Sequence, residues 1–224
     1  MTFKELTLRL LILFGLTGCN QTSDKQTGGK TGNVLLAGKE VFSLYKKVDT
    51  LIYVARALKT SSDTVDLHLY EVNTSIAEGA TQKFVSVAHL TPQQLDSRKS
   101  ELQSEYTWTP SKGNEILFVQ IQPTNFKDEM QLLDKRQEIE TITSKALQDK
   151  KLGEWFAGDL GPGGGNILYR VNDINRSIEI ILNILQQNRL ETNVLIGRRV
   201  LIDKVDWFYE VIYPTKYSGN FNTM

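Results

Sequence analysis

Apolar and polar residues follow a regular order from residue 111 onward, and this order predicts strands and helices in turn. The segment 114–123 is largely apolar, which predicts a buried strand that Pro123 ends. The segment 126–152 places its apolar residues at helical spacing. The remaining predicted elements are strands over 153–160 and 166–171, a helix capped by Asn172 or Asp173, and strands over 193–200 and 206–214.

This order predicts an α+β protein. A strand, a helix, two strands, a helix and a strand make up the ferredoxin-like arrangement, in which both helices cover one face of an antiparallel sheet. The extra strand over 206–214 is expected to form a hairpin with the strand over 193–200. We therefore predict a ferredoxin-like domain over 111–224. In its first helix we expect apolar contacts at Met130, Leu133, Ile139, Ile142 and Ala146.

A smaller α+β segment is predicted over 34–110. Apolar residues over 34–48 fit one helical face, and the β-branched and aromatic residues over 50–58 favour a strand, although one long helix is the alternative. The alternation over 63–72 predicts a half-buried strand, and a further strand is expected over 82–90. Thr91 and Pro92 are typical of a helix start, and that helix is expected to end near Glu105.

The first residues differ from the rest because they combine a basic start with a short apolar run. Lys4 and Arg9 precede the run Leu10–Leu16, which is too short to span a bilayer as a mature helix. The following Leu16-Thr17-Gly18-Cys19 resembles the bacterial lipobox. That resemblance implies a signal peptide over 1–18, attachment of diacylglycerol to the Cys19 sulfur, cleavage before Cys19, and acylation of its new amino group, for which palmitate is the expected acyl chain. A free cysteine behind an ordinary hydrophobic leader is the alternative.

The segment after Cys19 has no aliphatic or aromatic residue up to Asn33. Such a composition buries nothing, so residues 19–33 are predicted to form a lipidated, flexible tether. The predicted location is the bacterial cell envelope, with membrane contact through the lipid anchor. Asn20 behind the lipidated cysteine favours the outer membrane if the host has two membranes.

Overall charge excludes a nucleic-acid partner. The chain has 26 Lys and Arg residues against 26 Asp and Glu residues, whereas nucleic-acid binding needs a basic excess. The two histidines, His68 and His89, are not spaced with other ligands as a metal site requires. No cofactor or metal is predicted.

The glycine-rich stretch Gly158–Gly165 raises the question of a phosphate-binding loop. A dinucleotide fingerprint or a P-loop leads from a strand into a helix, and the latter needs Lys and Ser or Thr after its last glycine. Here Asn166 and Ile167 follow, and the next element is predicted to be a strand. The stretch therefore predicts a hairpin turn and no nucleotide site.

The segment Leu152-Gly153-Glu154-Trp155, the glycine-rich hairpin and Ile167-Leu168-Tyr169 together resemble a widespread group of small bacterial proteins of uncharacterised function. The similarity covers residues 112–213. It implies the ferredoxin-like fold and an immunity or binding role, and its motifs carry no catalytic residue.

Candidate partner-binding residues lie in the last part of the chain. Arg198 and Arg199 are adjacent on a strand and are expected to face opposite sides, where one can hold an anion or a carboxylate of a partner. Aromatic anchors are typical of binding surfaces, and the tail offers Trp207, Tyr217 and Phe221. Edge-strand charge and core packing are the structural alternatives for these residues.

Two functions remain open from the sequence. The favoured one is a membrane-anchored, non-enzymatic protein-binding module, of which a toxin-neutralising immunity protein is one form. The alternative is an envelope hydrolase that uses Glu154 and Asp159, the acidic residues beside the glycine hairpin, as a carboxylate pair.

Overall fold

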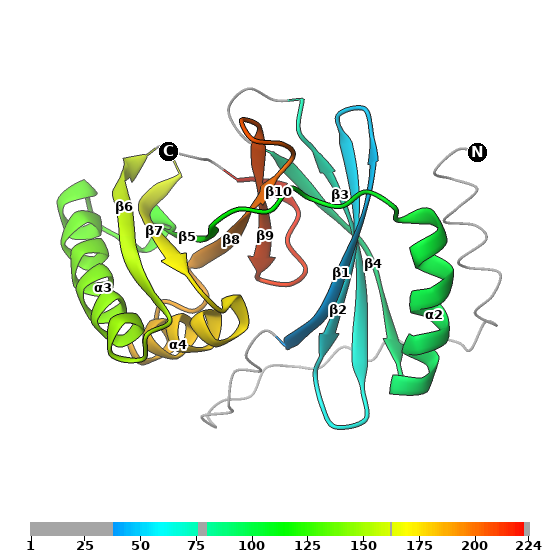
Figure 1. The fold of residues 1–224 in the computed structure, drawn as a ribbon. Helices are drawn as coiled ribbons and strands as arrows, with labels where there is room; N and C mark the ends of the chain where they lie inside the picture. The colour runs from blue at the N-terminus through cyan, green and yellow to red at the C-terminus, as the bar shows by residue number, and fades with distance from the viewer. Residues whose placement is uncertain (1–37, 76–79, 162, 222–224) are drawn as a thin grey trace, which may run out of the picture. The chain divides into compact units, whose positions relative to one another are not determined.

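Two antiparallel sheets of five strands, with α-helices on their outer faces, form the folded part of the chain. The computed structural model describes residues 38–75, 80–161 and 163–221, which belong to one compact unit, Val34–Met224. In Figure 1 the layers follow one another as α3 and α4, the second sheet, the first sheet, and α2. The predicted α+β class is confirmed. The predicted signal peptide, Cys19 and the tether lie outside the described residues.

The first sheet has the strand order β1-β2-β3-β4-β10. Four of its strands follow one another as an antiparallel meander, and a short strand from the C-terminal tail pairs with the last of them. The strands are β1 (Lys39–Val48), β2 (Leu51–Lys59), β3 (Val65–Asn73), β4 (Thr81–Leu90) and β10 (Gly219–Asn220).

The helix predicted over 34–48 is wrong for its described residues, which form β1. Tyr45 pairs with Val54 of β2, and the hairpin continues up to Lys39 opposite Lys59. A bulge between Glu40 and Phe42 shifts the alternation of the strand, so its apolar residues mimic helical spacing. Pairing with β2 therefore overrides the local pattern.

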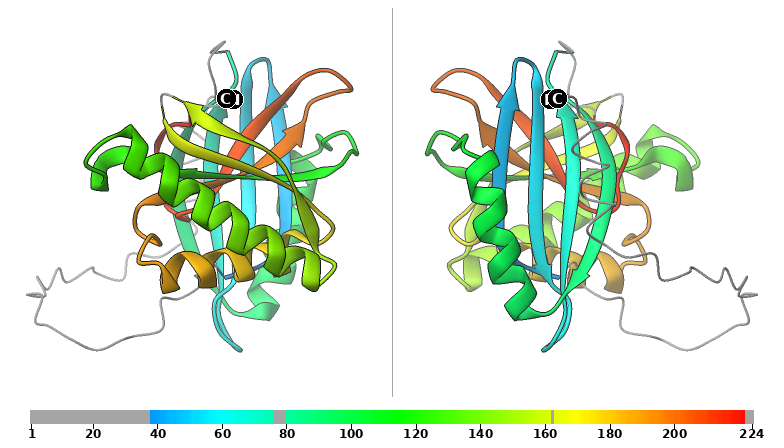
Figure 2. Two further views of the ribbon diagram at one scale, coloured as in Figure 1. Left: turned by 90° about the vertical axis from the view of Figure 1, so that its left-hand side faces the viewer. Right: turned by 90° about the vertical axis from the view of Figure 1, so that its right-hand side faces the viewer.

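Strand β3 is confirmed, but it is buried on both faces instead of one. Leu67 faces the core under α2, whereas Tyr70 and Val72 face the core between the two sheets. The helix α2 (Pro92–Glu105) begins as predicted, because Thr91 and Gln94 form a capping box. Figure 2 shows α2 lying across the outer face of the first sheet.

The second sheet has the strand order β6-β7-β5-β8-β9, all antiparallel. Its strands are β5 (Glu115–Ile121), β6 (Gly153–Gly161), β7 (Gly164–Val171), β8 (Val194–Leu201) and β9 (Trp207–Tyr213). The short 3-10 helix η1 (Pro123–Asn125) follows β5. The helices α3 (Glu129–Asp149) and α4 (Ile174–Gln187) lie on one face of this sheet (Figure 2). The predicted hairpin of the last two strands is confirmed as β8–β9.

The buried face of α3 agrees with the predicted one at Ile139, and the half-buried Ala146 packs against the same core, but the rest of the stripe differs. Met130 and Ile142 are exposed, whereas the helix buries residues on a neighbouring stripe. Its buried residues are Leu132, Arg136, Ile139, Thr143 and Leu147. Arg136 can lie on this stripe because its Nη1 donates to Glu140 at 2.6 Å and to the carbonyl of Asn166 at 3.3 Å.

The glycine-rich stretch is a hairpin turn between β6 and β7, as predicted. Gly161 lies opposite Gly164 in the pairing, and no helix follows the glycines. Gly164 has φ +128°, a value that favours glycine, and a Cβ there would overlap the carbonyl oxygen of Ile121. The hairpin therefore gives no helix N-terminus for a phosphate.

The inner faces of the two sheets share a core. Tyr45, Ile52 and Tyr70 of the first sheet pack with Val200 and Phe208 of the second. No helix in the described ranges combines the length and the hydrophobicity that a membrane crossing requires.

Candidate functional site

A group of charged side chains lies buried between the two sheets. The carboxylate of Glu210 has no solvent exposure and accepts hydrogen bonds from Arg56 and Arg198, the latter from Nε at 2.8 Å. Arg198 also donates from Nη1 to both carboxylate oxygens of Glu40 at 2.9 Å. Two carboxylates and two guanidinium groups thus balance one another, and we call Glu40, Arg56, Arg198 and Glu210 the ion cluster.

The strand pairings position the ion cluster. Arg198 of β8 lies directly opposite Glu210 of β9, so this pair is fixed within the second sheet. Arg56 of β2 and Glu40 of β1 reach the pair from the first sheet. The cluster therefore joins the two sheets through charge-assisted hydrogen bonds.

Tyrosine side chains surround the charges. The Tyr45 hydroxyl donates to Glu210 at 3.1 Å and accepts from Arg198 at 2.8 Å. The Arg56 guanidinium carbon lies 4.9 Å from the centre of the Tyr70 ring, a cation–π distance. These neighbours take the place of water around the buried ions.

Titration of the cluster follows from burial and ion pairing. Burial raises the pKa of Glu210, but Arg198 and Arg56 outweigh this effect and lower the pKa to about 2. Burial raises the pKa of Tyr45 far above its ordinary value, and it raises that of Tyr70 to about 12. At neutral pH Glu210 is therefore ionised and both tyrosines are neutral.

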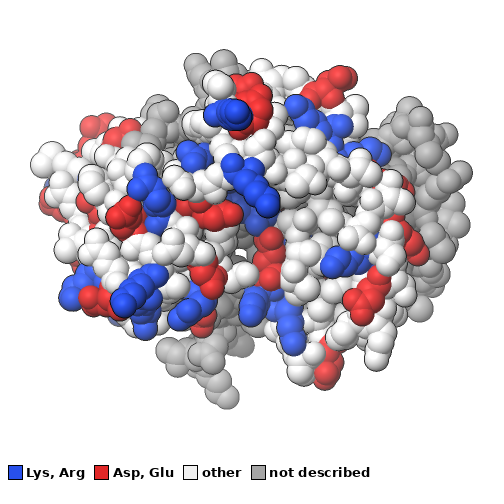
Figure 3. Space-filling view, in the orientation of Figure 1, with Lys and Arg blue, Asp and Glu red and all other residues white. Residues whose placement is uncertain are grey.

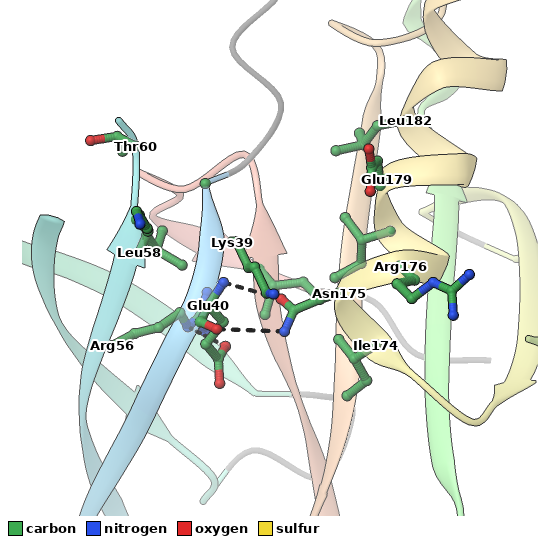
Figure 4. A pocket seen from close by; sticks show the side chains of 14 residues that line it. Lys39, Glu40, Arg56, Leu58, Thr60, Ile174, Asn175, Arg176, Glu179 and Leu182 are labelled. Atoms are coloured by element: carbon green, nitrogen blue, oxygen red, sulfur yellow. Dashed lines mark hydrogen bonds and ion pairs between the residues drawn. The ribbon is translucent and has the colours of Figure 1, made fainter. Parts of the chain in front are cut away.

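A pocket of about 310 Å³ opens beside the ion cluster, between the β1–β2 hairpin and the first turns of α4 (Figure 4). Glu40 and Asn175 form one wall, because the Asn175 side chain accepts from the Glu40 backbone N–H at 3.1 Å. Arg56 also lines the pocket, and its Nε and Nη1 have no hydrogen-bond partner among the described residues. The apolar lining residues are Leu58, Ile174, Ile178, Leu182 and Ile212.

Two of the residues that the sequence offers for a partner lie inside the unit. Arg198 belongs to the ion cluster, and Phe221 packs between Phe118 and Tyr209 with ring centres 4.8 and 5.8 Å away. Phe221 is 1% exposed. The segment after Pro214 therefore contributes a core residue, although most of its side chains are polar. Neither side chain is available on the surface, because each fills space within the fold.

The other three candidates remain nearer the surface. Trp207 is 43% exposed, and Arg199 donates to the carbonyl of Asn114 at 3.2 Å. The half-buried Tyr217 donates to the carbonyl of Asn220 at 2.6 Å. Among the described residues, no hydrogen bond or ring contact links Trp207, Arg199 and Tyr217 to one another. The structure therefore does not join these three residues into one site.

The acidic residues of the hydrolase alternative bind different neighbours. Glu154 forms an ion pair with Arg170 at 2.8 Å, and Asp159 accepts from the Asn166 side chain at 2.8 Å. His89 contacts Asp66 at 2.7 Å, and burial lowers the pKa of His68. In the part of the chain that the structure describes, no group of His, Cys, Asp and Glu is arranged to hold a metal ion.

Strand β6 is an edge of the second sheet and carries large apolar side chains in solvent. Trp155 and Phe156 are each 45% exposed, and Leu160 is 38% exposed. A bulge between Trp155 and Ala157 leaves Phe156 without a cross-strand partner in the pairing with β7. Arg170 of β7 lies over the Phe156 ring at 5.0 Å. We call Trp155, Phe156, Leu160 and Arg170 the edge patch.

Charge gives no further indication of a binding surface. On the face drawn in Figure 3, Lys and Arg side chains lie intermixed with Asp and Glu, and neither sign covers a large continuous area. This distribution agrees with the formal net charge of zero.

Sequence reasoning missed Glu40, Arg56 and Glu210. Two signals were present, because Arg56 interrupts the apolar strand 51–58 and Glu210 interrupts the apolar strand 207–213. A charge within a buried strand needs a partner of opposite sign. The sequence does not say which charges meet, since the ion cluster joins residues more than 150 positions apart.

Comparison with known proteins gives no relative for this chain. No protein family model, curated protein or solved structure matches it.

Proposed function

We propose that the chain is a lipid-anchored protein of the bacterial envelope whose folded unit binds a protein partner and catalyses no reaction. The lipobox-like Leu16-Thr17-Gly18-Cys19 supports the anchor, and the polar segment up to Asn33 supports a tether between lipid and fold. In a host with two membranes, we place the anchor in the outer membrane. A toxin neutralised at the envelope is one class of partner in this proposal.

The edge patch is the observation that carries the binding role. Trp, Arg and large aromatic side chains supply most of the energy at protein interfaces, and they do so when a partner removes them from water. The patch combines Trp155, Phe156 and Arg170 on an edge strand. Trp155 and Phe156 do not belong to the hydrophobic cores of the described residues.

We further propose that residues 111–224 form a ferredoxin-like domain in which β9 is the extra strand. The order β6-β7-β5-β8 and the position of α3 and α4 on one face support this arrangement. It places the edge patch on β6 and its neighbour β7, at the border of the sheet.

The test uses the full, membrane-anchored chain with Trp155→Ser and Phe156→Ser together. We expect only a small drop in melting temperature and loss of the co-purifying partner, because both rings are half exposed and lie outside the hydrophobic cores. Trp207→Ser is the matched control, since Trp207 is equally exposed on the opposite edge of the sheet. Retention of the partner by the double variant would contradict the proposal. Cys19→Ala tests the anchor separately, since it should prevent lipid attachment and membrane-dependent processing.

A further inference from the structure

We infer that the pocket beside the ion cluster is a binding site for a small carboxylate that carries an unbranched apolar chain. The pocket has a polar end at Glu40, Arg56 and Asn175, whereas Leu182 lies at the other end, beside Glu179 (Figure 4). Ile178 also lines the pocket. At about 310 Å³ it has the size of the smallest pockets that hold small molecules. The inference is independent of the proposed protein partner, because the edge patch lies on other residues.

Arg56 is the first observation that points to a ligand. Its side chain is fully buried, and its Nη2 donates to Glu210. Its Nε lies 3.8 Å from a carboxylate oxygen of Glu40, beyond hydrogen-bond distance, and its Nη1 has no acceptor among the described residues. Buried donors without an acceptor are costly, so an additional acceptor at this position stabilises the site.

The helix α4 is the second observation. It has 14 residues and begins at Ile174, and its first two turns line the pocket. The dipole at a helix N-terminus favours a negative charge. The N-cap Asp173 already supplies one carboxylate here, which accepts from the Arg176 backbone N–H at 3.0 Å. The side chains in the lining add to this preference, because Lys39, Lys59, Arg56 and Arg176 outnumber Glu40 and Glu179.

The apolar part of the lining defines the rest of the ligand. Leu58 and Ile212 come from the two sheets, and Ile178 and Leu182 from α4, so aliphatic side chains make up much of the lining beyond the ion cluster. Lys59, Thr60 and Glu179 line the same part of the pocket. An unbranched alkyl chain fits such a lining better than a polar body does. Glu40 lies between Arg56 and the open part of the pocket (Figure 4), and its side chain is 21% exposed. The carboxylate of the ligand reaches Nη1 by displacing the Glu40 side chain, which then gives up its hydrogen bonds from Arg198 and Ser43 to the incoming carboxylate.

Binding is measured by calorimetry on the full chain carrying Cys19→Ala, with butyrate, hexanoate and octanoate as probes. We expect affinity to rise by roughly fourfold for each added methylene until the pocket is full. Octanol, which lacks the charge, should bind at least about tenfold more weakly than octanoate, because it cannot form charge-assisted hydrogen bonds.

Two variants locate the site. Ile178→Trp fills the apolar part of the pocket without touching the ion cluster, and it should abolish octanoate binding. Ile142→Trp, on the exposed side of α3, is the matched control and should leave binding unchanged. Arg56→Gln should remove the preference for octanoate over octanol. If Arg56→Gln does not fold, the Ile178→Trp variant and the comparison of octanoate with octanol on the original protein still test the inference. Equal binding of octanol and octanoate, binding unaffected by Ile178→Trp, or no saturable binding at millimolar octanoate would each overturn the inference.

Discussion

Arg198 and Glu210 lie directly opposite one another on β8 and β9, and the Arg198 Nε donates to the Glu210 carboxylate at 2.8 Å. Both side chains are buried, and Arg56 contacts the same carboxylate from the other sheet. This cross-strand pair therefore organises the junction between the two sheets. Removing one member leaves the others charged and without water.

Replacement of Glu210 by Ala should destabilise the fold strongly. Two guanidinium groups would remain buried without their shared carboxylate, which typically costs about 3–5 kcal/mol. Urea unfolding at neutral pH measures the difference in the free energy of unfolding. Glu154→Ala is the matched control, because it breaks the half-exposed ion pair with Arg170 and should cost no more than about 1 kcal/mol. Equal effects of the two substitutions would show that the ion cluster does not hold the sheets together.

Acid should weaken the fold through the same carboxylate. The folded pKa of Glu210 is about 2, below its ordinary value of 4.5, so the folded state holds the ionised form more strongly than the unfolded state does. The resulting stability is present above the unfolded pKa and is lost as pH falls from about 5 towards 2. This loss is on the order of 3 kcal/mol.

The Glu210→Gln variant provides the comparison, because it has no carboxylate to titrate. Its free energy of unfolding should depend less on pH over the same range. Parallel pH profiles for the two proteins would mean that other carboxylates cause the acid effect.

Gly164→Ala should destabilise the glycine hairpin far more than Gly165→Ala. Gly164 has φ +128°, and a Cβ there would overlap backbone of β5, so strain alone costs roughly 1–3 kcal/mol. Gly165 has an ordinary φ, and the nearest atoms to its Cβ belong to the Arg136 side chain at 3.2 Å. Thermal melting of both variants checks the difference. Melting temperatures that agree would remove the conformational argument for this turn.

Phe221→Ala should lower the free energy of unfolding, measured by urea unfolding, by about 3–5 kcal/mol, because the ring fills the space between Phe118 and Tyr209. Truncation after Pro214 should cost at least as much, since it also removes β10 and the acceptor that Thr215 offers Tyr70. Val205→Ala changes an exposed apolar residue and is the control. Its free energy of unfolding should stay within about 0.5 kcal/mol of that of the unsubstituted protein. Intact stability of the truncated chain would place Phe221 outside the core.

The sequence predicted most elements of the second sheet, because each strand or helix there has a clear period and a recognisable start. Asp173 caps α4 and Pro123 follows β5, as expected. The prediction from sequence was wrong for β1, because a bulge interrupts the alternation of apolar and polar residues there. The strand forms through its pairing with β2. The prediction was also wrong for part of the buried stripe of α3, since Arg136 is buried through bonds to Glu140 and Asn166 that no local pattern reveals.

The candidate site was less predictable than the fold. The edge patch contains Trp155, which the sequence places beside the glycine hairpin but whose exposure depends on β6 being an edge strand. The sequence left Phe221 open between partner binding and core packing, and the structure places its ring in the core against Gly197. The ion cluster and its pocket depend on contacts between the two sheets, and these contacts are long-range in sequence.

Position-resolved photo-cross-linking in the membrane-anchored protein tests the proposed function most directly. A photoreactive phenylalanine analogue replaces Trp155 or Phe156 in the edge patch, Trp207 on the opposite edge, or Ser97 on the exposed side of α2. We expect one covalent adduct of defined mass from positions 155 and 156, and none from positions 207 and 97. Adducts from position 207 alone, or equal adducts from every position, would contradict the assignment of protein binding to the edge patch.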